Sequence, residues 1–210
     1  MLTYVKNRPP ATLILSVIAI LAVCSGCDRA PVGKIVDKDK YAVVVRGDGE
    51  SSFLDQYVAA SKLIGQGKIA EAERIYHELA QIEPDSPNPY VGLGSCCLNR
   101  EDPSGAREWY QKALQKQSNC VNAFIGLGTS YSQEHNFTNA LASYERARAL
   151  DDNSPEAHYG LTTTYLELGN KAEARLHFTR YKKLFPNSPY IASLEYYIER
   201  GPPTATLPAR

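Results

Sequence analysis

The stretch YVGLG at residues 90–94 returns as FIGLG at 124–128 and as HYGLT at 158–162, an interval of 34 residues each time. The same interval links four alanines and, four positions after each, four aromatic residues. These are Ala72, Ala106, Ala140 and Ala174, followed by Tyr76, Tyr110, Tyr144 and Phe178. No insertion breaks the register between residues 53 and 188. A fixed period of this length indicates a repeat architecture.

Turn and helix-start signals keep the same interval. Ser86-Pro87, Ser154-Pro155 and Ser188-Pro189 share one phase, and serine followed by proline is a good N-cap and first helical residue. Asp102-Pro103 is a further cap of this kind. A second turn signal falls inside each unit, at Gly67-Lys68, Glu101-Asp102, His135-Asn136 and Gly169-Asn170. Each unit is therefore predicted to be a helix of about 14 residues, a tight turn and a second such helix.

This pattern resembles the tetratricopeptide (TPR) repeat, which places Leu-Gly, Tyr, Ala, an aromatic residue and Pro at fixed positions in 34 residues. The resemblance implies an all-α fold, a right-handed solenoid of four TPR helix pairs. The repeats are residues 53–86, 87–120, 121–154 and 155–188. Glycines inside the first helices cost about 1 kcal/mol each relative to alanine. We expect close helix approach at Gly92, Gly126 and Gly160 to compensate for that cost.

The last repeat needs a cap over its apolar face. Residues 189–200 supply one, because Ile191, Leu194 and Ile198 share a helix face and Gly201 follows as a stop signal. The TPR solenoid domain is thus predicted to span residues 52–200. Residues 201–210 are predicted to be a disordered tail.

Residues 1–27 have the layout of a secretory signal. A positive start with Lys6 and Arg8 is followed by an apolar run from Ala11 to Val23 and then by small residues. That run has 13 residues, short of the roughly 20 that a membrane helix needs. Residues 23–27 resemble the bacterial lipobox, whose cysteine is diacylated and becomes the new N-terminus. The resemblance implies a lipoprotein signal peptide over 1–27 and lipidation of Cys27.

Other interpretations of the N-terminal region stay open. Residues 1–27 could be an uncleaved or ordinary signal, or a misleading stretch in a cytosolic protein. A redox or metal pair at Cys24 and Cys27 would need a folded environment that this region does not offer. We expect residues 28–51, which mix charges with Gly and Pro, to be a flexible tether. The expected location is the bacterial cell envelope, with the chain lipid-anchored to a membrane and facing the periplasm or exterior.

The sequence offers no constellation for catalysis. Its 23 basic and 23 acidic residues give no net field toward nucleic acid. The four histidines occupy different repeat positions, and no H-E-x-x-H, G-x-S-x-G or phosphate loop occurs. We therefore expect no catalytic residues, no metal, no cofactor and no small-molecule substrate. Cys120 is a candidate reactive thiol. It takes the repeat position at which other repeats have an N-cap serine, and a helix N-terminus lowers the pKa of a nearby thiol.

The resemblance also implies a concave groove lined by the first helix of each repeat. The predicted partner-binding residues are Tyr57, Ser61, Val91, Ser95, Ile125, Thr129, Tyr159 and Thr163. None is Lys or Arg, so the clamp that some TPR domains use for a C-terminal carboxylate is absent. A neutral groove suits a helix or extended segment of another protein. The competing interpretation is that these side chains pack on the protein itself or meet water.

These observations favour a non-catalytic, membrane-anchored TPR lipoprotein. The resemblance to bacterial TPR lipoproteins implies a protein–protein interaction scaffold or adaptor in envelope or pilus assembly. The alternatives are a cytosolic or signal-anchored TPR adaptor and, less favoured, a thiol-reactive protein. No nucleic acid partner is expected.

Overall fold

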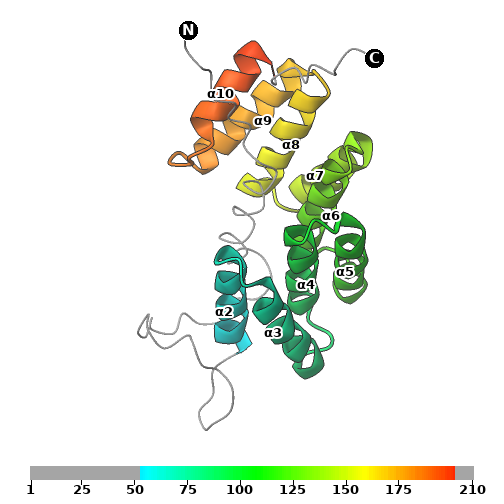
Figure 1. Ribbon diagram of the computed structural model, residues 1–210. Coiled ribbons are helices and arrows are strands. Elements are labelled where there is room, and N and C mark those ends of the chain that lie inside the picture. Colours follow the sequence, from blue (N-terminus) through cyan, green and yellow to red (C-terminus); the bar gives the residue numbers. More distant parts are fainter. Residues whose placement is uncertain (1–52, 202–210) are drawn as a thin grey trace, which may run out of the picture. The chain divides into compact units, whose positions relative to one another are not determined.

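The computed structural model describes residues 53–201, and all regular structure in this part of the chain is helical (Figure 1). The helices are α2 (Phe53–Gly65), α3 (Ile69–Ile82), α4 (Asn88–Asn99), α5 (Pro103–Lys116), α6 (Val121–Gln133), α7 (Phe137–Leu150), α8 (Pro155–Glu167), α9 (Lys171–Leu184) and α10 (Ile191–Arg200). Four pairs and a terminal helix confirm the predicted all-α class. The predicted signal peptide, tether and tail lie outside the described residues. No helix within 53–201 is long and apolar enough to cross a bilayer.

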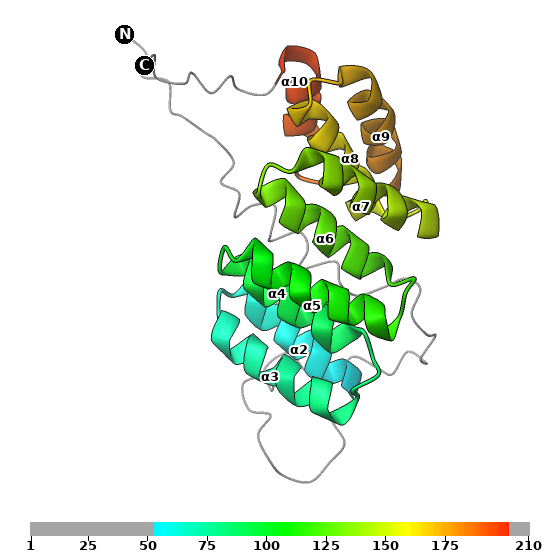
Figure 2. The ribbon, with the colours of Figure 1, turned by 90° about the vertical axis from the view of Figure 1, so that its right-hand side faces the viewer.

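The helices belong to two compact units, and the division between them in the chain falls between Ser118 and Asn119. In the first unit α2 to α5 pack in chain order, and α2 also packs on α4 (Figure 2). In the second unit α6 to α9 pack in chain order, α6 also contacts α8, and α10 lies on α8 and α9. Each unit thus contains two helix pairs stacked on one another, mainly through the second helix of one pair and the first helix of the next. This is expected for repeats that bury their apolar faces on one another.

The turn inside each repeat has one backbone conformation. Gly67, Glu101, His135 and Gly169 all have positive φ, at 77°, 60°, 58° and 74°. The next residue caps the second helix. Asp102, Asn136 and Asn170 each accept a hydrogen bond from the backbone N–H three residues on, whereas Lys68 makes no side-chain cap. The turn positions predicted from the 34-residue phase are confirmed.

Glu101 carries backbone strain that Gly169, at the same phase, does not. A non-glycine residue pays about 1–2 kcal/mol in this left-handed conformation, offset by the greater freedom of glycine when unfolded. We expect Glu101→Gly to raise the free energy of unfolding by about 0.5 kcal/mol and Gly169→Ala to lower it by about 1 kcal/mol. Urea unfolding followed by circular dichroism measures both. Destabilisation by Glu101→Gly would show that its side chain has a role that outweighs the strain.

Only one of the three Ser-Pro pairs caps a helix as predicted. The Ser154 hydroxyl accepts from the Ala157 N–H at 3.2 Å. By contrast, α4 begins at Asn88 after an already helical Pro87 and has no side-chain cap. The helix α10 begins only at Ile191. The Ser188 hydroxyl lies 2.5 Å from the buried hydroxyl of Tyr181 and accepts from the Tyr190 N–H, before the helix starts. The predicted capping helix is otherwise confirmed, with Leu194 and Ile198 buried and Gly201 at φ 87°.

Tyrosines of the second helices fill slots left by glycines of the first helices. A Cβ on Gly92 would lie 2.4 Å from the Tyr76 ring, and one on Gly94 would lie 2.6 Å from the ring of Tyr110. These distances are far below van der Waals contact, so only glycine fits. The expected close approach at Gly92 is thereby confirmed.

Tyr144 has such a slot on both sides. A Cβ on Gly128, in its own repeat, would lie 2.6 Å from the ring, and one on Gly160, in the next repeat, would lie 2.4 Å from it. The expectation for Gly160 is confirmed, and that for Gly126 stays a prediction. Gly94 and Gly128, the second glycines of YVGLG and FIGLG, also leave room for a tyrosine ring. From the sequence, this was expected only of the first glycine in each of these stretches. Helix pairs in the second unit therefore stack around a tyrosine ring that alanine would displace.

Candidate protein-binding surface

The ninth residue of a repeat carries a hydroxyl on the first helix. In the first three repeats this hydroxyl contacts the hydroxyl of the second-helix tyrosine whose ring packs against a glycine. The Thr129 hydroxyl lies 3.1 Å from that of Tyr144, and the Ser95 hydroxyl lies 3.4 Å from that of Tyr110. Ser61 forms the matching hydrogen bond with Tyr76. Burial raises the pKa of all three phenols, so they are neutral at physiological pH. In each of the first three repeats, one such polar contact joins the two helices of the pair.

The fourth repeat departs from this arrangement. Its second helix carries Phe178, which has no hydroxyl to satisfy. The Thr163 hydroxyl donates to the backbone carbonyls of Tyr159 and Gly160, at 3.1 and 3.0 Å. Both acceptors lie on its own helix. Ser95 and Thr129 also donate to a carbonyl one turn earlier, but each has the tyrosine contact as well. Among the four predicted groove residues at this position, Thr163 is therefore the one whose hydroxyl makes no contact with a tyrosine of the second helix.

The residues at the fifth position form much of the core. Tyr57 lies edge-on to Tyr76 with ring centroids 5.5 Å apart and is buried. Val91 and Ile125 are each 5% exposed. Tyr159 is half-buried against the rings of Tyr181 and Tyr190, each 5.5 Å away.

Of the eight predicted groove residues, the structure therefore leaves three half-buried side chains. They are Ser95, on α4 in the first unit, and Tyr159 and Thr163, on α8 in the second. Two asparagines at the starts of first helices add polar surface, with Asn88 half-buried and Asn122 exposed. Sequence phase placed all eight on the first helices but could not tell which were used in packing. That any of them contacts a partner stays a prediction.

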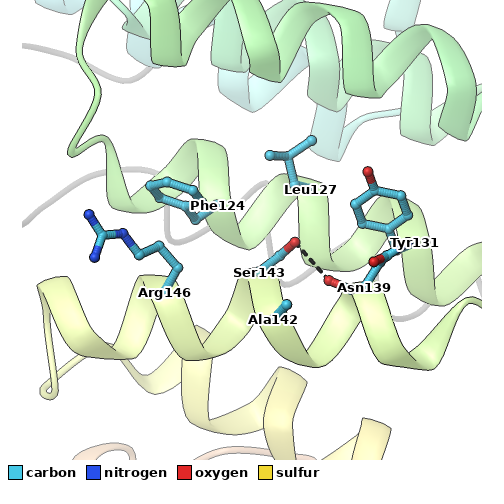
Figure 3. A pocket seen from close by; sticks show the side chains of 7 residues that line it. All are labelled: Phe124, Leu127, Tyr131, Asn139, Ala142, Ser143 and Arg146. Carbon is cyan, nitrogen blue, oxygen red and sulfur yellow. Dashed lines mark hydrogen bonds between the residues drawn. The ribbon is translucent and has the colours of Figure 1, made fainter.

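A separate open depression of about 440 Å³ lies on α6 and α7 (Figure 3). Phe124, Leu127 and Tyr131 line it from α6, and α7 contributes Asn139, Ala142, Ser143 and Arg146. The Ser143 hydroxyl is already engaged, donating to the Asn139 carbonyl at 2.9 Å. The Arg146 guanidinium lies 5.9 Å from the centroid of the Phe124 ring. These groups suit apolar and cation–π contacts, and no paired nucleophile and base is among them.

The cysteines of the described helices are buried. Cys96, Cys97 and Cys120 are at most 3% exposed, and none is in a disulfide. Burial raises the pKa of Cys96 to about 12 and also raises that of Cys97, although the nearby Arg100 opposes the shift for both. Cys120 stands at the N-cap of α6 without a side-chain cap hydrogen bond. Thiolates are the reactive form, so this arrangement protects the thiols.

We expect these thiols to resist modification while the chain is folded. In a Cys24→Ser, Cys27→Ser background at pH 8, a thiol-specific chromogenic reagent should react at least tenfold more slowly with native than with urea-unfolded protein. Raising the pH to 9 should not close the gap, because Cys96 stays protonated there. Rapid labelling of native Cys120 would instead support the thiol-reactive alternative.

No group of three or more His, Cys, Asp and Glu side chains within the described helices is arranged to hold a metal ion.

Comparison with known proteins identifies the family of this fold. A family model for the tetratricopeptide repeat matches residues 63–127 and again residues 131–195, which is more than half of the chain. The chain belongs to the tetratricopeptide repeat family. The two TPR matches begin 68 residues apart, which is twice the 34-residue period. A search of curated proteins finds no match.

Solved TPR structures share the fold at low sequence identity. A chain of the APC/C hetero-tetramer Cut9–Hcn1 aligns with a TM-score of 0.61 and 18% identity over 70% of this chain, which spans only 30% of that one. The structure described for the functional characterisation of Pseudomonas aeruginosa pilF has a TM-score of 0.61 and 19% identity, covering 70% of this chain and 69% of its own. YrrB, described as a TPR protein with an unusual peptide-binding site, has a TM-score of 0.54 and 18% identity, covering 70% of this chain and 75% of its own.

Proposed function

We propose that this TPR protein is a non-catalytic scaffold for protein–protein interaction, anchored to a membrane of the bacterial envelope through a diacylated Cys27. Membership of the TPR family carries the scaffold proposal, because stacked helix pairs expose long surfaces suited to another chain. The peptide-binding site named for YrrB supports a peptide-like partner. Envelope or pilus assembly is the setting that the resemblance to bacterial TPR lipoproteins suggests.

The face of α8 is the best candidate for the partner contact. Tyr159 keeps a half-buried ring that is already held in place by Tyr181 and Tyr190, so little side-chain entropy is lost on binding. Thr163 lies one turn further along the same helix and is half-buried. A fixed aromatic ring beside a small hydroxyl is a suitable anchor for a helix or extended segment.

Partner capture tests this surface. We expect Thr163→Arg to weaken capture of the partner at least tenfold, because it places a long charged side chain on a neutral face. Leu176→Arg is the matched control, since Leu176 is 63% exposed on the second helix α9. Substitutions at the buried Val91 or Ile125 would not serve, because a charge there would unfold the chain. Equal capture by both variants would contradict the proposed surface.

The anchor is tested by membrane fractionation and mass spectrometry. We expect the wild-type chain in the membrane fraction, beginning at Cys27 and carrying acyl groups. Cys27→Ala should abolish acylation and signal cleavage, whereas Cys24→Ala should leave both intact. A chain that stays soluble in the cytoplasm would support the cytosolic adaptor, and a membrane-bound chain without acyl groups would support an uncleaved signal anchor.

A further inference from the structure

Two buried histidines meet between α8 and α9. His158 and His177 are 3% and 7% exposed, and their Nδ1 atoms lie 3.2 Å apart. The imidazole of His177 also stacks on Tyr165, with centroids 5.6 Å apart and ring planes only 3° from parallel. The pair therefore forms part of the contact between the two helices of the fourth repeat.

The hydrogen bonds fix where the protons lie. The Nε2 atom of His158 lies 3.1 Å from the Asp152 carbonyl oxygen, which can only accept, so this nitrogen carries a hydrogen. In the neutral ring Nδ1 of His158 is then an acceptor. Nδ1 of His177 must donate to it, which leaves Nε2 of His177 without a hydrogen.

Charged groups from three neighbouring segments surround the pair. Glu145 and Arg148 come from α7, Asp152 from the turn before α8, and Glu173 and Arg180 from α9. The Glu145 carboxylate lies 3.8 Å from Nε2 of His177, and the Asp152 carboxylate lies 3.8 Å from Nε2 of His158.

Both of these carboxylates are already paired with arginines. Arg148 donates from Nε to Glu145 at 2.7 Å, and Arg180 donates to Asp152 at 3.0 Å. Their charge is therefore largely offset before any imidazolium forms. One positive ring can form beside Glu145, whose carboxylate faces the bare Nε2 of His177. A second positive ring would then lie directly against the first.

We infer that His158 and His177 form an acid-sensitive joint, which holds α8 against α9 while the pair carries at most one extra proton and opens when both rings are charged. The first proton enters at the bare Nε2 of His177, facing Glu145, and leaves the bond between the rings intact. The second can only enter at Nδ1 of His158. It sets two N–H groups and two positive charges against each other across 3.2 Å, so the rings must separate.

The direction of titration agrees with this geometry. Burial lowers the pKa of both histidines, and each is lowered further by nearby positive groups, including His158 in the case of His177. The unfolded chain takes up these protons near pH 6.5, and the folded chain only at lower pH. The stability that the neutral pair contributes is thus complete above that pH and is lost as the pH falls below it.

Side-chain ¹⁵N NMR of the wild-type full chain in detergent micelles tests the inference directly. At pH 7.5 we expect His158 with its hydrogen on Nε2 and His177 with its hydrogen on Nδ1. On acidification the pair should titrate in two separate steps, both below the ordinary imidazole pKa of about 6.5. The reverse tautomers, or titration of both rings together at that ordinary value, would overturn the inference.

Hydrogen exchange tests the opening. Between pH 7 and pH 5, protection factors of α9 amides in the wild type should fall about tenfold more than those of α3. The double variant His158→Gln, His177→Gln should lose this difference, and His135→Gln, at an exposed site, should keep it. An acid response that persists in the double variant would overturn the joint. Should that variant fail to fold, the wild-type NMR titration decides alone.

Discussion

Replacing Gly160 by alanine should destabilise the second unit by about 2 kcal/mol, although alanine is the better helix former by about 1 kcal/mol. The added methyl group would lie 2.4 Å from the Tyr144 ring. That ring cannot retreat, because the backbone at Gly128 stands against its other side. Relief requires α7 and α8 to move apart, which loses contacts along both helices.

Gly65→Ala is the matched control for this prediction. Gly65 also lies in a first helix, at the end of α2, but a Cβ there would meet nothing within 4 Å. Alanine at residue 65 should therefore be neutral or stabilising. Urea unfolding followed by circular dichroism compares the two variants. If Gly160→Ala were as stable as Gly65→Ala, Tyr144 would not be fixed in the slot described.

Tyr144→Ala should have the largest effect on stability, a loss of about 4 kcal/mol in the free energy of unfolding. Tyr144 is 4% exposed and packs in one cluster with Ile125, Leu161 and three alanines. Removing the ring leaves a cavity between α6, α7 and α8 that the rigid helices cannot close. Tyr144→Phe keeps the ring and loses only the hydroxyl contacts with Thr129 and Ser132, so it should cost about 1 kcal/mol.

The difference between these two variants separates packing from hydrogen bonding. The fourth repeat supports the smaller cost for phenylalanine, because Phe178 occupies this phase naturally and Thr163 keeps its hydrogen bonds to backbone carbonyls. Equal losses for Tyr144→Phe and Tyr144→Ala, measured by urea unfolding, would mean that the hydroxyl contact and not the ring holds the pairs together.

Features that recur in every repeat could be predicted from the sequence. The period, the turns at Gly67 and His135, and the glycines that admit tyrosine rings follow from local chemistry repeated at one phase. One expected helix start, at Ser188-Pro189, was wrong for a local reason. Ser188 contacts a tyrosine hydroxyl from the preceding helix, whereas Pro87 has the helical backbone angles expected of a first helical residue. A contact such as that of Ser188 depends on tertiary neighbours.

Features confined to one repeat escaped prediction. His158 and His177 occupy unrelated phases, so only the packing of α8 on α9 brings their rings together. The groove residues show the same limit. Helical phase placed Ser95 and Thr129 on the first helices, but their hydroxyls face tyrosines fifteen residues further along the chain. Which groove side chains remain available to a partner therefore depends on the residue in the paired helix, as Thr163 opposite Phe178 illustrates.

Site-specific photo-crosslinking in living cells tests the scaffold proposal most directly. The crosslinking amino acid p-benzoylphenylalanine would replace Thr163 on α8 or, as the control, Leu176 on α9. The account predicts a discrete crosslinked protein from residue 163, found in the membrane fraction and lost when Cys27 is changed to alanine. Crosslinks from residue 176 alone, or a product that persists in the cytoplasm without Cys27, would contradict it.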